Sequence, residues 1–317
     1  MDATGGIDKI ERLILNRVAI FAHFDTKNII DDYVLFYINA LKKVCSDIIF
    51  VSCCDLPQDE LSKLECHKIA KKHNEYDFGS YKRGFLYAKE NNLLTNCDEL
   101  IFANDSCYGP FKPLDKIFSD MSEKACDFWG MTKNKYAFKI VKNRTKDCFI
   151  PHVQTYFFVL KQKVFDSQVF NEFINSVKEE ENKNSIIEKY EIGMTTALEQ
   201  AGFVSDGAIK TFYKYNNPTV YKWRDLYKKT DFPFVKCSLL RLNNHLHTTV
   251  DGWRELFSKE QIDLIEKNLS YTQKRPLKHT CPRVIKEFVF NHLPNRKMKS
   301  RMITRALLRS VLAFLTD

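Results

Sequence analysis

The sequence predicts an α/β fold with a mostly parallel central sheet. Short apolar runs, too brief for helices, alternate along the chain with longer stretches in which apolar residues recur at helical spacing. This alternation is typical of parallel strands joined by helical crossovers. One such run, residues 100–103, ends abruptly in Asn104-Asp105-Ser106. Polar side chains at the end of a buried strand mark the edge where open α/β sheets bind their ligands.

The strands are predicted from apolar runs that are short or rich in aromatic and β-branched residues. The runs at 17–24 and 47–52 are nearly continuous, and the run at 153–160 carries Val153, Tyr156 and two phenylalanines. The expected strands, in order, are residues 17–24, 47–52, 100–103, 127–132 and 153–160.

The helices are predicted from apolar residues three and four positions apart. Val34, Ile38 and Leu41 share one face of the first, and Gly202 is a C-cap candidate for the longest. The expected helices are residues 31–43, 61–73, 81–91, 114–121, 166–178, 185–201, 250–269 and 303–315. Residues 212–243 contain two prolines and irregularly spaced aromatic residues and predict a loop-rich lobe, whereas residues 179–184 are a charge run exposed to solvent.

Composition indicates an ordinary globular protein. Of the 317 residues, 44% are hydrophobic and 28% are charged, and no apolar stretch is long enough for a transmembrane helix. The N-terminal residues lack the basic and apolar regions of a secretory signal, so a cytoplasmic location is expected. The ten cysteines include no C-x-x-C pair, which favours reduced thiols over metal ligands or disulfides.

The positive charge is concentrated at the C-terminus. Between 271 and 317, eleven lysines and arginines stand against two acidic residues, which accounts for the whole net charge of +9. The body is therefore neutral, and no nucleic-acid partner is expected for it. The tail alone predicts an anionic partner surface.

The triplet Asn104-Asp105-Ser106 has two interpretations. A carboxylate at this place could hold a divalent cation against a diphosphate, because such cations prefer oxygen ligands. Alternatively, Asp105 only completes an Asx-turn by accepting hydrogen bonds from backbone N–H groups.

The segment Asn74-Glu-Tyr-Asp-Phe-Gly-Ser-Tyr-Lys-Arg-Gly84 precedes that strand. Asp77 or Ser80 can cap the helix that follows, and Lys82 and Arg83 lie in its first turn. A helix N-terminus with nearby cations predicts an anion site suited to a nucleotide diphosphate. The alternative is an ordinary capped helix.

Three further residues could line a pocket. His152 and Gln154 share one face of the aromatic strand, where they could bind a sugar or merely be satisfied at the strand end. Glu191 lies in or just before a helix whose Ile192, Thr195 and Thr196 face inward. An inward carboxylate is the general base that an inverting group transfer needs. Glu188 competes for this role, and the alternative for both is a surface position on a helix.

Taken together, several segments resemble a known family. They are Tyr76-Asp-Phe-Gly-Ser-Tyr-Lys-Arg-Gly84, Asn104-Asp-Ser-Cys-Tyr-Gly-Pro110, Asp127-Phe-Trp-Gly-Met-Thr132, Gln154-Thr-Tyr-Phe157, Tyr190-Glu-Ile-Gly193, Asn217-Pro-Thr219, Pro233-Phe-Val-Lys236 and Leu239-Leu-Arg241. In this order, over about residues 14–245, the chain resembles the rhamnan synthesis protein F family, bacterial glycosyltransferases of cell-envelope polysaccharides. The resemblance implies a GT-A-like, Rossmann-type nucleotide-sugar-binding fold. It also implies transfer of L-rhamnose from dTDP-rhamnose to a lipid-linked glycan.

The resemblance also implies roles for individual residues. Asn104-Asp105-Ser106 occupies the place of the Asp-x-Asp motif, so Asp105 is the candidate ligand for Mg²⁺ or Mn²⁺. Asp77, Ser80, Lys82 and Arg83 would lie at the nucleotide, and Glu191 would be the base. Trp129 and Tyr156 would form walls for the acceptor or donor sugar, with core packing as the alternative for both. His245 and His247 follow the matched region and are candidate late metal ligands.

These interpretations divide the chain into a glycosyltransferase domain, 1–245, and a helical, basic C-terminal region, 246–317. The helix expected at 303–315 combines cations with an apolar stripe and could lie on the inner face of the plasma membrane. Alternatively, it docks on the body. Two other functions remain open: a transferase that uses a UDP or GDP sugar, and a non-catalytic scaffold that binds anionic surfaces through the tail.

Overall fold

The computed structural model describes residues 15–141, 144–211, 217–242, 250 and 252–272, and its centre is a seven-stranded sheet within those residues. The strands of this sheet are β1 (Arg17–His23), β2 (Asp47–Ser52), β3 (His67–Ala70), β4 (Glu99–Asn104), β6 (Phe128–Gly130), β9 (Phe157–Lys161) and β10 (Ser205–Gly207). Two strand pairs lie outside it: β5 (Cys107–Tyr108) with β11 (Val235–Lys236), and β7 (Lys133–Val141) with β8 (Arg144–Val153).

The strand order across the sheet is β3-β2-β1-β4-β9-β6-β10. β9 runs antiparallel to β4 and β6, whereas the other pairings within the sheet are parallel. In the centre, Phe21 of β1 lies opposite Phe50 of β2 and Ala103 of β4. The predicted α/β class with a mostly parallel sheet is confirmed.

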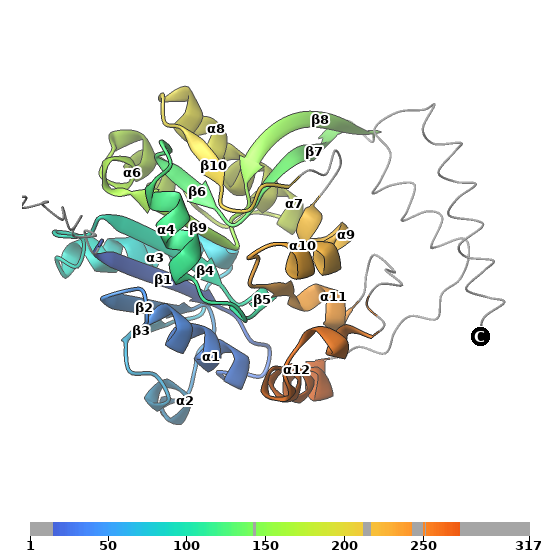
Figure 1. Ribbon diagram of the computed structural model, residues 1–317. Helices are drawn as coiled ribbons and strands as arrows, with labels where there is room; N and C mark the ends of the chain where they lie inside the picture. Colours follow the sequence, from blue (N-terminus) through green and yellow to red (C-terminus); the bar gives the residue numbers. More distant parts are fainter. Residues whose placement is uncertain (1–14, 142–143, 212–216, 243–249, 251, 273–317) are drawn as a thin grey trace, which may run out of the picture.

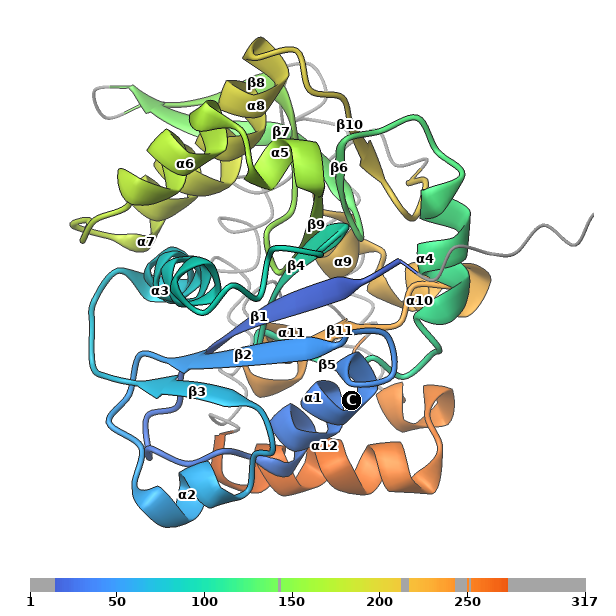
Figure 2. The same ribbon diagram turned by 90° about the vertical axis from the view of Figure 1, so that its left-hand side faces the viewer.

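Helices cover both faces of the sheet. They are α1 (Asp32–Leu41), α2 (Gln58–Ser62), α3 (Tyr76–Glu90), α4 (Asp115–Ser122), α5 (Gln162–Phe165), α6 (Gln168–Asn175), α7 (Lys183–Ile186), α8 (Gly193–Gln200), α9 (Pro218–Tyr221), α10 (Trp223–Lys229), α11 (Cys237–Arg241) and α12 (Lys259–Thr272). A π-helical segment, η1 (Ile187–Ile192), joins α7 to α8, and a 3₁₀ turn, η3 (Trp253–Leu256), precedes α12. Figures 1 and 2 show α3 on one side of β1, β2 and β3, and α1 with α12 on the other.

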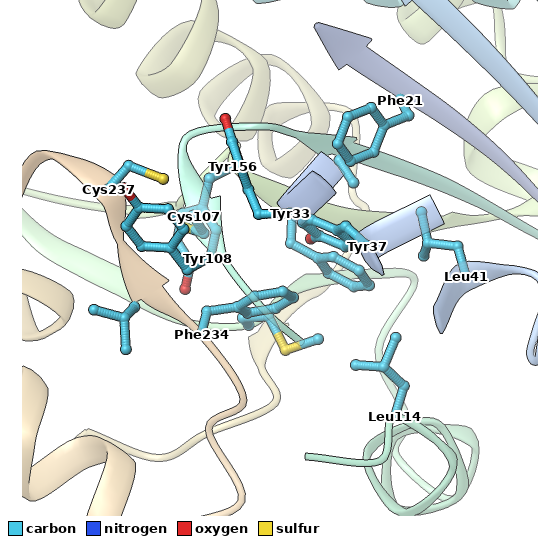
Figure 3. Packing of buried hydrophobic residues seen from close by; sticks show 14 of the residues in the cluster. Phe21, Tyr33, Tyr37, Leu41, Cys107, Tyr108, Leu114, Tyr156, Phe234 and Cys237 are labelled. Atoms are coloured by element: carbon cyan, nitrogen blue, oxygen red, sulfur yellow. The ribbon is translucent and has the colours of Figure 1, made fainter. Parts of the chain in front are cut away.

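Each face of the sheet has its own hydrophobic core, as the period-two alternation of strand side chains requires. Along β1, Ala19 and Phe21 pack with α1, α4 and α12, whereas Ile20 packs with α3, α6 and α8. In the first core the ring of Phe21 meets that of Tyr37 edge-on, with centroids 5.0 Å apart. Figure 3 shows this core, in which residues from α1, β5 and β11 converge. Burial on both faces explains why these strands are almost continuously apolar.

Residues beyond 245 contribute to the same core. Ile265 and Leu269 of α12 pack in the α1-side cluster. Asn268 of α12 is completely buried, accepts a hydrogen bond of 2.6 Å from the Tyr108 hydroxyl and donates one of 2.6 Å to Asp31 Oδ2. The described part of the C-terminal region is therefore packed into the body. The helix expected at 303–315 lies outside the described residues.

Three sequence predictions about the elements were wrong. Residues 61–73 form the end of α2 and the edge strand β3, not one helix, because β3 is only half-buried and lacks a continuous apolar run. Residues 153–160 are not one strand, since β8 ends at Val153 and β9 starts at Phe157. The hairpin β7–β8 was not predicted. Among the described helices, none has both the length and the apolar character needed to cross a bilayer.

Candidate active site

Polar side chains gather where parallel strands of the sheet end. β1 ends at His23, β2 at Ser52 and β4 at Asn104. His23 Nδ1 and Ser52 Oγ lie 3.0 Å apart and are both buried. Burial lowers the pKa of His23 to about 4, so this imidazole is a neutral hydrogen-bonding group at physiological pH. These strand ends form the edge at which open α/β sheets bind ligands.

The turn after β4 separates the roles of Asn104 and Asp105. Asn104 Oδ1 accepts hydrogen bonds from the backbone N–H and the hydroxyl of Ser106, at 3.1 and 2.6 Å. Asn104 thus makes the local Asx-turn that the sequence offered as the alternative for Asp105. Asp105 reaches across to the end of β1, where Oδ2 accepts the backbone N–H of Phe24 at 2.8 Å.

Asn104 also connects this turn to the first turn of α3. Its Nδ2 donates to Oδ2 of Asp77 at 2.8 Å. An aspartate at position 104 could not donate this hydrogen bond and would place a second negative charge against Asp77. The geometry therefore gives a physical reason for an amide where the Asp-x-Asp pattern has a carboxylate.

Too little positive charge surrounds the carboxylates at this edge of the sheet to keep their pKa values in the usual range. Burial raises the pKa of Asp105 to about 8, and the nearby charges of Asp77 and Asp25 add to this, against the opposing effects of the Phe24 N–H and of Arg241. Burial also raises the pKa of Asp77 above its usual range. At neutral pH the site consequently retains a proton or attracts a cation.

Glu191 lies near Asp77 in the π-helical segment η1, a type of helical irregularity frequent at functional sites. Its Oε2 accepts a hydrogen bond of 2.8 Å from the hydroxyl of Thr155, and its Oε1 lies 3.5 Å from His152 Nε2. Burial acts to raise the pKa of Glu191, but His152, Thr155 and Lys236 outweigh burial and hold that pKa below its usual range. The side chain is therefore an ionised carboxylate at neutral pH.

The three carboxylates share one electrostatic environment. Asp77 raises the pKa of Asp105, and Glu191 in turn raises that of Asp77. The structure thus brings together side chains from α3, from the turn after β4 and from η1. These are the residues that the sequence selected at positions 77, 105 and 191.

Two cations that sequence reasoning missed lie beside these carboxylates. Lys236 Nζ donates to Ser106 Oγ at 3.1 Å and lies 3.8 Å from the centroid of the Tyr156 ring. Arg241 Nε donates to Asn268 Oδ1 at 2.9 Å, and its charge acts to lower the pKa of Asp105. Both residues close segments that resemble the family, which was the one signal available for them.

A buried group of hydrogen-bonded polar side chains lies next to Lys236. The Thr132 hydroxyl donates to Gln154 Oε1 at 2.7 Å and lies 3.0 Å from the hydroxyl of Tyr156. His152 is held by Nδ1, which lies 2.7 Å from the carbonyl oxygen of Ile150. Gln154 and His152 thus have protein partners in the structure. Figure 3 shows Tyr156 above the core residues of β5 and α11.

A family model named rhamnan synthesis protein F matches residues 48–306 of the chain. The chain belongs to the rhamnan synthesis protein F family. The strand order given above agrees with the predicted α/β class with a mostly parallel sheet, and the GT-A-like description of it stays a prediction. The virulence protein VirA of Vibrio anguillarum is 27% identical over 223 residues, which cover 60% of this chain and 66% of VirA.

Two solved structures resemble this family member weakly. A putative nucleotide-diphospho-sugar transferase from Desulfovibrio desulfuricans is 9% identical, with a TM-score of 0.41, over 83% of this chain and 99% of that one. A glycosyltransferase involved in the glycosylation of the major capsid of PBCV-1 is 10% identical, with a TM-score of 0.38, over 79% and 99% of the two chains.

Several residues that the resemblance placed at the ligand have other surroundings in this member of the rhamnan synthesis protein F family. Lys82 Nζ donates to the carbonyl oxygens of Asn175 and Val177, and Arg83 pairs with Glu75 at 3.0 Å. Ser80 Oγ lies 3.1 Å from His73 Nε2. The first two cations are therefore turned to other protein groups and not to the Asn104 turn.

Trp129 and Glu188 occupy the alternative positions considered for them. Trp129 is completely buried, with its ring centroid 5.4 Å from that of Phe118, so it has no surface on which a sugar could stack. Glu188 is exposed. Sequence spacing alone cannot distinguish these two positions, a buried one in β6 and an exposed one in η1, from positions that contact a ligand.

Among the described residues, no three side chains of histidine, cysteine, aspartate or glutamate cluster closely enough to hold a metal ion without other ligands. Asp105 nevertheless fits a cation that is also bound by a diphosphate, because its charge is poorly compensated and Mg²⁺ needs only one or two protein carboxylates beside phosphate oxygens and waters. His245 and His247 lie outside the described residues.

Proposed function

We propose that this chain is an inverting, nucleotide-sugar-dependent glycosyltransferase that moves L-rhamnose from dTDP-rhamnose to a lipid-linked envelope polysaccharide. The observation that carries the proposal is the ionised carboxylate of Glu191, which lies in one electrostatic cluster with Asp77 and Asp105 at the carboxyl edge of the sheet. Membership of the rhamnan synthesis protein F family supports it.

In the proposed reaction Glu191 is the general base. It takes the proton from the acceptor hydroxyl as the hydroxyl oxygen forms a bond to the anomeric carbon of the sugar. The bond from that carbon to the phosphate oxygen breaks on the opposite face, and the electron pair leaves with the nucleoside diphosphate. A single base on the acceptor side gives inversion, because no second carboxylate is needed as nucleophile.

His152 positions the base in this mechanism. Its Nδ1 lies 2.7 Å from a carbonyl oxygen and its Nε2 lies 3.5 Å from Glu191 Oε1, so both ring nitrogens face acceptors, and the ring supports the charged carboxylate as an imidazolium, which donates from both nitrogens. Thr155 donates to the other carboxylate oxygen. Together they fix the orientation of the carboxylate and favour its charged form before the acceptor arrives.

The departing diphosphate needs positive charge. Lys236 Nζ, 3.1 Å from Ser106 Oγ, lies beside the turn that carries Asp105. A divalent cation, if used, would be held by Asp105 and would neutralise the diphosphate as a Lewis acid. Lys236 would supply a second, fixed charge from the protein itself.

The donor is tested by a screen of dTDP-rhamnose against UDP and GDP sugars, with release of the nucleoside diphosphate as the readout. We expect the largest release with dTDP-rhamnose and an increase on addition of Mg²⁺ or Mn²⁺. Preference for a UDP or GDP sugar would replace the donor and keep the enzyme. A protein that binds none of dTDP, UDP and GDP in calorimetry would instead be a scaffold, and the proposal would be abandoned.

Contact with the inner face of the plasma membrane stays a prediction from the basic tail, which lies outside the described residues. Flotation with vesicles that contain anionic lipids, with the chain ended after residue 272 as the comparison, measures it. Loss of vesicle binding on truncation is the expected result. Equal binding by both chains would remove the tail from this role.

A further inference from the structure

Tyr76, the first residue of α3, has a backbone conformation that bulky residues rarely adopt. Its φ is +54°, in the left-handed region that normally favours glycine. Such strain persists where the surrounding structure or the function requires the side chain. The side chain is 46% exposed, so it does not compensate the strain by burial in the core. Its ring makes no aromatic or cation contact with another described residue.

Phe24, the first residue after β1, carries a second exposed ring. It is 56% exposed, although its backbone N–H is fixed by the 2.8 Å hydrogen bond to Asp105 Oδ2. A phenylalanine in this position gains little from folding, because most of its apolar surface stays in water. Its backbone is nevertheless fixed by a hydrogen bond to the active-site turn.

Both residues are close to site residues through the backbone. Phe24 directly contacts Asp105 through its backbone, and Tyr76 immediately precedes Asp77, whose carboxylate accepts from Asn104. The other large apolar side chains that are exposed among the described residues are Phe36 and Val204. The ring of Phe36 lies beside that of Phe111, tilted and with centroids 5.7 Å apart. Val204 precedes β10, the outermost strand on the far side of the sheet from β3.

The order in which these residues lie along the carboxyl edge of the sheet indicates which part of the ligand each of them contacts. Just outside the neighbouring strands β1, β4 and β9 lie Phe24 after β1, Asp105 after β4 and Thr155 two residues before β9. The Thr155 hydroxyl donates to Glu191, the proposed general base. A nucleotide sugar is a chain of nucleobase, ribose, diphosphate and sugar. With the sugar at Glu191 and the diphosphate at Asp105, the nucleobase falls on the β1 side, next to Phe24, and Tyr76 precedes Asp77 at the start of the helix that faces the same turn.

We propose that Phe24 and Tyr76 form the nucleobase-binding subsite, with the base stacked on one or both exposed rings. The proposal rests on the proposed function and adds a residue assignment to it. Stacking on aromatic rings tolerates different bases. The rings therefore provide affinity for a nucleoside diphosphate, and choice among bases depends on other contacts.

The test is calorimetric titration of dTDP and of inorganic pyrophosphate into the full chain and its variants. Tyr76→Gly should weaken dTDP binding by about tenfold through loss of stacking, and Tyr76→Phe should retain it. Phe24→Ala should also weaken dTDP binding. None of these variants should change pyrophosphate binding, because pyrophosphate has no base to stack.

Thermal unfolding provides the second readout. Tyr76→Gly should raise Tm by about 2 °C, because glycine relieves the positive φ. Asn92→Gly is the matched control: Asn92 has φ +57° just beyond the far end of α3, so its replacement should affect Tm in the same direction without changing dTDP affinity. Val204→Ala controls for removal of an exposed apolar side chain away from the site.

The outcomes separate this proposal from the function on which it rests. Unchanged dTDP affinity in both Tyr76→Gly and Phe24→Ala would overturn the subsite while the transferase proposal stands. An equal loss of dTDP and pyrophosphate binding would also overturn it, since that result indicates a distorted site. Failure of the unmodified chain to bind any nucleoside diphosphate would overturn both proposals.

Discussion

β1 and β4 are neighbouring strands. The charged side chains at their amino ends are paired with each other, whereas those at their carboxyl ends are not. At the amino ends, Arg17 Nε contacts Glu99 Oε2 at 2.6 Å, with side chains only 14% and 2% exposed. At the carboxyl ends, Asp105 accepts one backbone N–H and faces other carboxylates, and its pKa is raised to about 8. The amino ends of these two strands therefore carry an ion pair, whereas the carboxyl ends carry carboxylates without such a partner.

The difference shows which edge is organised for stability and which for binding. A buried ion pair in contact offsets part of the cost of desolvating both charges, and removal of one partner is strongly destabilising. Clustered carboxylates raise each other's pKa and destabilise the unliganded fold, so their presence at one edge indicates a ligand that supplies the missing charge. Four predictions test this contrast between the two edges of the sheet.

Glu191→Gln should abolish transfer while nucleotide binding persists, because the amide keeps the shape of the side chain but cannot accept the proton. The expected loss is roughly 10³-fold in kcat, with KM for the donor little changed. Glu188→Gln, in the same π-helical segment but exposed, is the matched control and should keep full activity. Near-normal turnover of Glu191→Gln would remove Glu191 from the base role.

Arg17→Met should destabilise the fold by about 3 kcal/mol, because it leaves the Glu99 charge buried without its partner. Chemical denaturation measures this loss, and dTDP affinity should not change. The double variant Arg17→Met/Glu99→Leu should recover most of the stability. If Arg17→Met weakened nucleotide binding instead, the separation of the two edges would not hold.

Lys236→Met should weaken dTDP binding about tenfold, since it removes a fixed positive charge from the diphosphate position. Lys82→Met is the informative comparison, because the resemblance placed Lys82 at the nucleotide whereas its Nζ contacts two backbone carbonyl oxygens at the end of α6. Calorimetry should show a loss for position 236 only. A larger loss for Lys82→Met would reverse the assignment.

Asp105→Asn should stabilise the fold while it impairs turnover. The folded state keeps the Asp105 proton up to about pH 8, whereas the unfolded chain releases it near pH 4, so ionisation favours unfolding increasingly between these values. The amide removes this penalty. The gain in stability should therefore grow steadily from pH 5 to pH 8, as followed by thermal unfolding at each pH. A gain that is equal at both pH values would show that Asp105 carries no raised pKa.

Sequence patterns identified much of the fold and a part of the site. β2 has the bounds that its apolar run predicted, and the Asx-turn expected after residue 103 is present, although Asn104 and not Asp105 makes it. β3 was missed because an edge strand of four half-buried residues carries no clear periodicity. Lys236 was not assigned to the site because its contact with Ser106 joins residues 130 positions apart.

The sequence by itself determined the α/β class and the approximate ends of β1, β2 and β4, because apolar runs and abrupt polar endings are local signals. It also selected the carboxylates at residues 77, 105 and 191 as candidates for the site. Only the tertiary structure decided which charges meet. It buried Trp129, turned Lys82 away and brought Lys236 beside the pocket. Burial and proximity of charges depend on how distant segments pack, and they control pKa values far more strongly than the local order of residues does.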